Sequence, residues 1–495
     1  GYPQSWASVA RWEAHWATHN TVWSTVPNIE VGRLSGRGRL IRCLSFNGIQ
    51  ILEIEARRWH GELDESPTDL DSRPDVMSNA RWRQSGVNFR RLLALIETEE
   101  KGVVVVDLSR IQGGSEHWRT CRGLNGSFNS DDIKWTGRPG NVVNEGSGRG
   151  DEENLGHPDQ AGLSWMDNVR TAEPRSHWDG SWQSSREKEV HLDVHQTRIS
   201  ESTDLMSARA TATMGTPEES SYCYQTLVWR RTPDNEQETS AIDLVMEPRI
   251  GAPVLSDVSG LGASEGSASA VTLQTVGGLS LTIYWAPEST GKETTFEDGA
   301  ALSGELAVVT GSDVTVCGDG GLELEGKMYP GPGKGIVSIE SLHRDARTID
   351  VSGLNGLGAG DRIRVNPDGR GHSYSVENVE ELGEGRIRLT LDVTSLLGRS
   401  RVKSVNQDCL DLSMSIMART GNLNQTRLLV GDSEKGISIV DAMNPDREST
   451  RLWVEDPIAI GSVQSGDWVN VVDYVVGDVV EFEPIATMDR CAEST

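Results

Sequence analysis

The sequence predicts an all-β protein: an antiparallel, multi-stranded β-sandwich followed by a smaller β-sandwich or barrel domain. Short apolar or alternating runs recur along the 495 residues, and turn-forming Gly, Asn, Asp and Pro separate them. Neither an internal repeat nor a coiled-coil heptad pattern competes with this interpretation. A helix is an alternative only within residues 1–20.

In the first half, strands are expected at residues 40–44, 49–56, 89–97, 102–109, 190–197, 223–230 and 242–247. The run Val103-Val104-Val105-Val106 lacks alternation, which is typical of a strand covered on both faces. Residues 123–190 are poor in aliphatic side chains and rich in Gly, Ser, Asn, Asp and Trp, so we expect long loops there. Their expected anchors are Trp135, Trp165, Trp178 and Trp182.

In the second half, the Gly/Ser/Ala-rich residues 256–270 suggest a loop or weak boundary, and strands resume at 279–285 and 306–316. The segment 329–333, Tyr-Pro-Gly-Pro-Gly, is the strongest turn signal and the expected domain boundary. Further strands are expected at 347–351, 361–365, 386–391, 410–417 and 479–482. We therefore divide the chain into an entry segment 1–30, a central sandwich 31–328 and a C-terminal β domain 334–495.

The formal net charge of -27 argues against a nucleic-acid-binding protein, which needs a basic face. No segment approaches the ~18 apolar residues of a membrane span. A negative field also slows the approach of a polyanion, although a local arginine-lined cleft could still bind one. Of the 47 basic residues eight are Lys, and Arg is the better bidentate partner for carboxylates. A saline habitat or a GC-rich genome is the simpler explanation of this composition.

The six cysteines lie far apart, and no C-x-x-C pair is present. Neither a zinc knuckle nor a redox motif is therefore predicted. One or two long-range disulfides in an oxidising compartment and buried free thiols remain the two alternatives.

Two short patterns carry the functional information. The first is His19-Asn20-Thr21-Val22, and the second is Arg110-x-x-Gly113-Gly114-x-x-His117. The paired glycines permit a tight turn or bulge that would re-aim His117 away from the strand axis. Arg110 could pair with Asp107 or with a carboxylate of a substrate.

In this order, within a β-rich chain, the two patterns resemble the C-terminal half of the heparinase II/III-like polysaccharide lyases. Residues 89–93 and the strand 240–248, which ends in Glu-Pro, resemble further strands of the family. The resemblance as a whole covers roughly residues 1–255. The family has a second His before Gly where this chain has Arg122, which weakens any role for a histidine pair. The family also has an acidic residue before Gly-aromatic where this chain opens at Gly1-Tyr2. We therefore expect a fragment whose helical toroid and main catalytic residues lie upstream, and we assign no catalytic residue here.

The resemblance implies that His19 is one ligand of a metal site, usually zinc, whose other ligands lie before Gly1. A closed shell of two imidazoles and one carboxylate suits zinc. The alternative is a histidine that caps a loop beside Trp16 and Trp23. One histidine is not a site, so this chain alone is not expected to bind metal. The resemblance also places Tyr2, Arg110 and His117 near the substrate.

The leading functional hypothesis is a lyase that cleaves a uronic-acid polysaccharide by β-elimination, inactive without its missing half. The expected partner is an anionic uronate polysaccharide, in the periplasm or outside the cell; a homodimer is left open. The alternative is a non-catalytic, carbohydrate-binding or structural β-sandwich. The 15 tryptophans against seven tyrosines and five phenylalanines suit sugar stacking as well as core packing.

Three tempting patterns are not assigned a site. His191-x-Asp193-x-His195 places three potential ligands on one strand face, but a solvated face explains them. The segment 157–159, His-Pro-Asp, follows His19 instead of preceding it. The segment 366–369, Asn-Pro-Asp-Gly, is a turn without the alternating oxygen ligands of a calcium loop.

Overall fold

The computed structural model is nearly all β, and its strands pair antiparallel, which confirms the predicted fold class. It describes residues 17, 19–26, 34–63, 80–99, 102–151, 155–156, 158–173, 175–211, 223–287, 292–367, 369–416, 422–431, 436–445 and 448–490. Within these described ranges, three short 3-10 helices interrupt the strands: η3 (Pro158–Trp165), η4 (Arg344–Ala346) and η6 (Pro457–Ile460).

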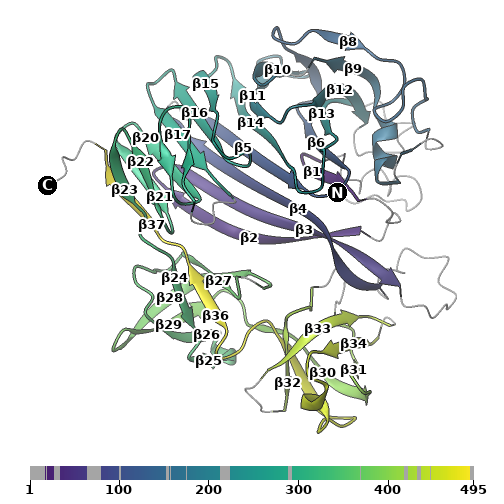
Figure 1. Cartoon of the computed structure of the whole chain (residues 1–495), viewed down its shortest axis with the longest axis vertical. Coiled ribbons are helices and arrows are strands. Elements are labelled where there is room, and N and C mark those ends of the chain that lie inside the picture. Colours follow the sequence, from purple (N-terminus) through teal and green to yellow (C-terminus); the bar gives the residue numbers. More distant parts are fainter. Residues whose placement is uncertain are drawn as a thin grey trace.

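An eight-stranded central sheet organises the upper part of the molecule (Figure 1). In spatial order its strands are β2 (Leu34–Phe46), β3 (Ile49–Leu63), β4 (Ala80–Glu97), β5 (Val103–Gln112), β14 (Thr239–Ile250), β11 (Val190–Ile199), β10 (Trp178–Ser184) and β7 (Gly126–Asn129). The first four strands form a meander, in which consecutive strands pair side by side.

Two six-stranded sheets cover the central sheet. The motif sheet contains β1 (Val22–Thr25), β6 (Glu116–Arg122), β13 (Cys223–Arg231), β12 (Thr203–Thr211), β9 (Asp167–Ala172) and β8 (Trp135–Gly137). The packing sheet contains β15 (Leu255–Leu261), β16 (Ser269–Thr275), β17 (Ser280–Trp285), β20 (Leu306–Thr310), β21 (Asp313–Cys317) and β37 (Ile485–Asp489). A small sheet of β18 (Thr294–Thr295), β19 (Ala301–Leu302), β22 (Gly321–Leu324) and β23 (Lys327–Pro330) lies beside the packing sheet.

The central sheet has a core on each side. Toward the packing sheet, Leu92 and Val106 join Leu273 and Ile283 in one apolar cluster. Toward the motif sheet, the cluster combines central-sheet and motif-sheet side chains around Trp182. Residues 107–111 of β5 are all buried, so this strand is covered on both faces, as expected. Within the valine run itself, residues 104 and 106 are buried, whereas 103 and 105 are only partly buried.

Of the two expectations for irregular segments, the first is confirmed in part and the second is wrong. Residues 123–190 contain long loops, such as 138–151, but they also hold β7 to β10 and η3, whose tryptophans supply the apolar packing that aliphatic side chains supply elsewhere. Trp178 and Trp182 are at most 1% exposed, and Trp178 stacks on Trp229 with ring centroids 6.4 Å apart. Residues 255–261 form strand β15, whose side chains Leu255 and Val258 pack into the core in spite of the many small residues around them.

The C-terminal part holds two further modules (Figure 1). A seven-stranded sheet contains β24 (Gly335–Ser338), β36 (Val479–Phe482), β27 (Arg362–Val365), β28 (His372–Gly383), β29 (Arg386–Leu391), β26 (Thr348–Ser352) and β25 (Ser341–His343). A closed barrel contains β30 (Leu396–Val405), β31 (Cys409–Leu412), β34 (Thr450–Val454), β33 (Ile437–Met443), β32 (Arg427–Val430) and β35 (Trp468–Val472). The last strand, β37, crosses the division predicted after residue 328, because it returns to pair with β21.

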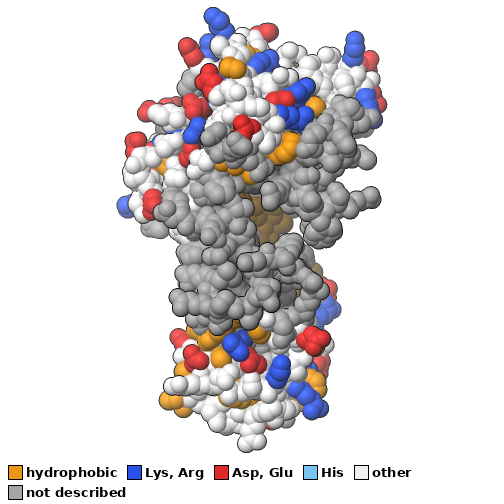
Figure 2. All heavy atoms as spheres, turned by 90° about the vertical axis from the view of Figure 1, so that its right-hand side faces the viewer, with side chains coloured by type: hydrophobic (Ala, Val, Ile, Leu, Met, Phe, Trp, Pro, Cys, Tyr) orange, Lys and Arg blue, Asp and Glu red, His pale blue; other side chains and the backbone are white. Residues whose placement is uncertain are grey.

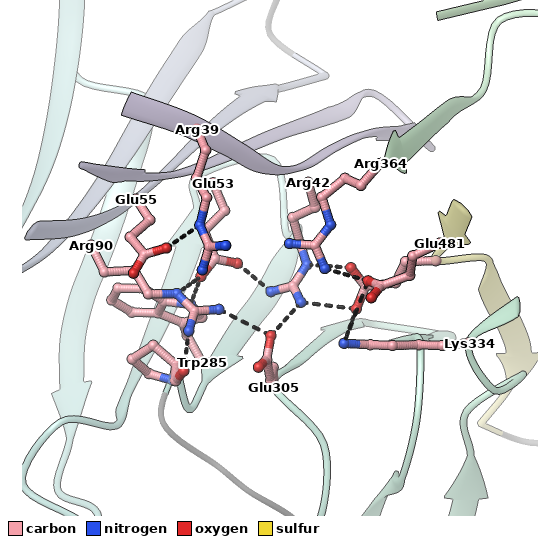
Figure 3. A network of polar contacts seen from close by, with 12 residues as sticks. Arg39, Arg42, Glu53, Glu55, Arg90, Trp285, Glu305, Lys334, Arg364 and Glu481 are labelled. Carbon is pink, nitrogen blue, oxygen red and sulfur yellow. Dashed lines mark hydrogen bonds and ion pairs between the residues drawn. The ribbon is translucent and has the colours of Figure 1, made fainter. Parts of the chain in front are cut away.

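A buried ionic network joins the central sheet, the packing sheet and the seven-stranded sheet (Figure 3). Arg42, on β2, contacts three carboxylates: Glu53, Glu305 at 2.6 Å and Glu483 at 2.8 Å. Arg90 shares two of them, at 2.6 Å to Glu53 and 3.0 Å to Glu305. The charges of both arginines outweigh the effect of burial and lower the pKa of Glu305 to about 2.

Five of the six cysteines lie among the described residues, and each of these five is a free thiol. Burial raises the pKa of Cys121 to about 11 and that of Cys317 to about 12, so both thiols are poor nucleophiles. The alternative of buried free thiols therefore holds for Cys121, Cys317 and Cys409, while Cys43 is exposed.

Candidate functional site

The two sequence motifs lie on neighbouring strands. Strand β1 pairs with β6, so that Ser24 lies opposite His117. Before β1, the side chain of Asn20 holds the backbone of Arg122 from both sides: its Oδ1 accepts from Arg122 N at 2.6 Å and its Nδ2 donates to Arg122 O at 3.3 Å. The hydroxyl of Thr120 donates to the carbonyl of His19 at 2.5 Å. The His-Asn-Thr segment is therefore fixed to the strand that follows the Gly-Gly turn.

The Gly113-Gly114 turn leads the chain from β5 in the central sheet to β6 in the motif sheet. Both glycines have positive φ, at 81° and 87°. A Cβ on Gly113 would lie 2.4 Å from the carbonyl oxygen of Gly86, and one on Gly114 would lie 2.1 Å from Ser24 Oγ. The hydroxyl of Ser24 donates to Gly113 O at 2.6 Å. The turn therefore requires glycine at both positions, as the sequence predicts for a tight turn.

His117 is buried behind this turn, with 1% of its surface exposed. Its Nε2 donates to the carbonyl of Gly113 at 3.0 Å, and its Nδ1 accepts from the hydroxyl of Ser240 at 2.6 Å. Arg231 donates to the same hydroxyl at 2.9 Å. Burial lowers the pKa of His117 to about 4, so the ring is neutral at physiological pH. In this structure the ring fastens the turn to β14.

Arg110 is also buried, and its partner is Asp243 rather than Asp107. Its Nη1 donates to Asp243 Oδ1 at 2.6 Å, and its Nε donates to the carbonyl of Ser267. The guanidinium lies 4.8 Å from the ring centroid of Trp285. This set of contacts ties β5 and β14 to the packing sheet.

Asp107 forms a second buried cluster on the other side of β5. Arg91 binds it through two hydrogen bonds, at 2.8 and 2.6 Å, and Arg119 donates to it at 2.6 Å. Burial alone would raise the pKa of Asp107, but the charges of Arg119 and Arg91 outweigh burial and lower it. Arg122, at the position of the family's second histidine, lies with its guanidinium 4.8 Å from the ring centroid of Tyr224.

His19, the expected metal ligand, is exposed. The described residues contain no group of three or more His, Cys, Asp or Glu side chains that could hold a metal ion. The part of the chain that the structure describes therefore does not by itself fit a zinc site around His19. Tyr2, the third residue expected near the substrate, lies outside the described residues, as do Trp16 and His157.

A cavity of about 720 Å³ opens beside the buried motif residues. The turns between β11 and β12 and between β13 and β14 form its walls, together with residues 265–267. Ser267 lines it and presents its carbonyl to Arg110; Arg231 lines it and connects through Ser240 to His117. The motif residues are thus one or two hydrogen bonds away from the solvent-filled space.

The charges around this cavity are mixed. Its basic side chains are Arg198, Arg231 and Lys292, and its acidic side chains are Glu201, Asp234, Glu238 and Glu265. Arg231 pairs with Glu238, and Arg198 donates to the carbonyl of Gly266 at 2.7 Å. With more carboxylates than basic groups, the lining suits the hydroxyl groups of a sugar better than a series of carboxylates.

Sequence reasoning missed Asp243, Ser240 and Arg231. Asp243 stands alone in the apolar run Ala241-Ile242-Asp243-Leu244-Val245, and a lone acid in a buried strand requires a cationic partner. That signal could have identified an ion pair, although not its partner. Ser240 and Arg231 carry no comparable signal in the sequence.

The patterns that were not assigned a site have ordinary partners. Asp193 binds Arg249 Nε at 2.5 Å, and His195 Nδ1 lies 2.7 Å from Asp179. At the 366–369 segment, the amides of Gly369 and Gly371 both donate to the carbonyl of Asn366 at 2.9 Å, which is the geometry of a turn.

No protein-family model matches this chain, and no curated protein matches it. Among solved structures, a heparinase III superposes with a TM-score of 0.30 at 11% identity, over 56% of this chain and 31% of that one. A heparan sulfate lyase HepC mutant from Pedobacter heparinus gives a TM-score of 0.29 at 10% identity, again over 56% and 31%. The chain thus spans less than a third of the length of these enzymes. Among the described residues, no helix has the length and apolar character needed to cross a membrane.

Proposed function

We propose that this chain is the β-rich portion of a polysaccharide lyase that cleaves a uronic-acid-containing polysaccharide by β-elimination. The single observation that carries the proposal is that the two family-like motifs, distant in sequence, form one unit on paired strands β1 and β6. Asn20 of the first motif bonds to Arg122, which follows the second motif on β6, and Ser24, which follows the first motif on β1, bonds to Gly113 of the second.

In such a reaction a base removes the C5 proton of the uronate, the C4–O bond breaks, and a C4–C5 double bond forms. The leaving glycosidic oxygen takes up a proton from an acid, and neutralisation of the carboxylate makes the C5 proton acidic. We assign the base and the acid to residues outside those that the structure describes. Arg110 and His117 are buried, and both form hydrogen bonds within the protein. Arg110 holds β5 against β14, and His117 holds the Gly113-Gly114 turn.

Zinc remains part of the proposal only through His19. A zinc ion bound there would pin the start of β1 to ligands that lie outside the described residues, and it would act structurally. The backbone that carries this imidazole is already fixed, through Thr120 and Asn20, to β6. The periplasm or the cell exterior, where such polysaccharides occur, is the proposed location.

A non-catalytic carbohydrate-binding protein is the second candidate. The polar cavity of about 720 Å³ favours it, since guanidinium, hydroxyl and carboxylate groups there can all bond to sugar hydroxyls. This candidate needs no residue beyond those described.

Absorbance in the unsaturated-uronate band separates the two candidates. The protein expressed from its complete reading frame should raise this absorbance when incubated with alginate, heparin or chondroitin sulfate. The 495-residue chain alone should bind without raising it. Cleavage by the chain alone would show that its own residues include the base and the acid; binding without cleavage by the complete protein would favour the second candidate.

A further inference from the structure

The outer face of the barrel carries a basic stripe beside an exposed tryptophan. On β30 the buried side chains Ser400 and Val402 alternate with the exposed side chains Arg399, Arg401 and Lys403. Side chains two residues apart on a strand lie on the same face, so Arg399 and Arg401 form one row. Lys403 is exposed beyond them, at a register shift between Val402 and Ser404. The space-filling view shows basic, acidic and hydrophobic side chains mixed at the surface of this end of the molecule (Figure 2).

Trp468, on the neighbouring strand β35, organises this row. It lies opposite Arg401 in the pairing of β30 with β35, and 44% of its surface is exposed. The guanidinium carbons of Arg399 and Arg401 lie 4.8 and 4.9 Å from its ring centroid. Stacking on an aromatic ring orients a guanidinium while leaving its N–H groups in the ring plane free to donate.

The two arginines differ from most others in the described part of the chain. Arg42, Arg90, Arg110 and Arg119, for example, each contact a carboxylate within 3.0 Å. Arg399 and Arg401 form no ion pair among the described residues, where the partner of both guanidinium groups is the ring of Trp468. In a chain of net charge -27, two unneutralised guanidinium groups side by side form a local site for an anion.

We propose that Trp468, Arg399 and Arg401 form an accessory binding site for an anionic polysaccharide, with Lys403 extending it along β30. The identity of the polymer as a polysaccharide rests on the proposed function. That the polymer is anionic follows from the row of exposed cations on β30. Arginine suits carboxylate and sulfate groups because its fork donates two parallel hydrogen bonds. The side chain of Asn470, which lies opposite Arg399 on the outer face, can bond to sugar hydroxyls between the charges. The barrel would thus bind the polymer at a second position, separate from the cavity at the motif sheet.

Titration calorimetry of the 495-residue chain with heparin, alginate and neutral dextran tests this site. The chain should bind heparin or alginate with an affinity that falls as the salt concentration rises, and it should not bind dextran. Arg399→Gln/Arg401→Gln should lose at least about tenfold in affinity, since two charge-assisted hydrogen-bonding groups disappear. Trp468→Ala should lose about two- to fivefold, because the guanidinium groups lose their support, and Trp468→Phe should lose less.

Arg362→Gln/Arg386→Gln is the matched control, because it removes two exposed arginines from the seven-stranded sheet and the same total charge. It should bind within about twofold of the original chain. Equal affinities of the stripe and control variants would overturn the proposal. So would absence of binding, equal binding of dextran, or tighter binding of single-stranded DNA or phosphatidylserine vesicles than of either polysaccharide.

The test separates this inference from the proposed function. If the stripe variant loses binding but the complete protein forms no unsaturated uronate, the accessory site stands and the lyase assignment fails. If the complete protein cleaves and the stripe variant binds like the control, the lyase assignment stands and the accessory site fails.

Discussion

Replacement of Arg42 by methionine should destabilise the protein more than any change to an exposed arginine. Arg42 is buried at the point where three sheets meet, and it is the cation shared by Glu53 and Glu305 (Figure 3) and by Glu483. Methionine has a similar length and is apolar, so the space stays filled while the charge disappears. The perturbation therefore isolates the ionic contribution from the packing contribution.

The remaining contacts decide the magnitude. Without Arg42, Glu53 keeps Arg90 at 2.6 Å and the indole of Trp285 at 3.0 Å. Glu483 keeps only Lys334 at 3.8 Å as a cationic partner within the described network. Because Glu483 is left nearly uncompensated, we expect a loss of about 3–5 kcal/mol in the free energy of unfolding.

The loss should depend on pH in a defined direction. Burial would raise the pKa of Glu483, but Arg42 outweighs burial and lowers it below the ordinary value. A carboxylate with a lowered folded-state pKa contributes stability above its unfolded pKa, and that contribution is lost as pH falls through the folded pKa. In Arg42→Met the carboxylate pKa rises instead, so acid neutralises the uncompensated charge. The difference in the free energy of unfolding between the original protein and Arg42→Met should therefore become smaller as pH falls from 7 toward 4.

Urea unfolding followed by tryptophan fluorescence measures this effect, because five fully buried tryptophans report on the upper part. They are Trp118, Trp178, Trp182, Trp229 and Trp285. Arg386→Met is the control and should change stability by less than about 0.5 kcal/mol. Arg42→Met/Glu483→Gln should recover part of the loss. A loss below about 1 kcal/mol for Arg42→Met, or no recovery in the double variant, would refute the reasoning.

Two further predictions concern the motif turn. Gly114→Ala should cost at least about 2 kcal/mol, because its Cβ would meet both Ser24 Oγ at 2.1 Å and Thr25 O at 2.5 Å. Gly146→Ala, with φ 84° and open space around its Cβ, should cost clearly less; equal losses in thermal unfolding would remove the steric argument. His117 has a folded-state pKa of about 4, below its unfolded value, so the folded state excludes a proton that the unfolded state binds. Stability should therefore fall as pH drops from about 6.5 toward 4, and His117→Asn should flatten this part of the urea-denaturation profile.

The features that sequence reasoning predicted are those set by local chemistry. The Gly113-Gly114 turn follows from the steric freedom of glycine, and β structure follows from the alternation of apolar side chains. The error at residues 255–261 has the opposite cause: its small residues resemble a loop, and only packing against the central sheet makes it a strand.

The position of side chains relative to solvent could not be predicted in the same way. His117 was expected to face the substrate side, but β14 covers it and supplies the hydroxyl of Ser240. The Arg42 network joins residues separated by up to 441 positions, so no local pattern announces it. The sequence shows that residue 468 is a tryptophan, but it does not show which side chains lie beside it. The contact with the two arginines follows from the pairing of β30 with β35.

The most direct test of the central claim is the mass of the products that the protein from the complete reading frame releases from alginate, heparin or chondroitin sulfate. β-Elimination predicts oligosaccharides with an unsaturated terminal uronate, lighter by one water than the products of hydrolysis. Hydrolysis products, or intact polymer recovered with the protein bound to it, would contradict the assignment of this β-rich chain to a polysaccharide lyase.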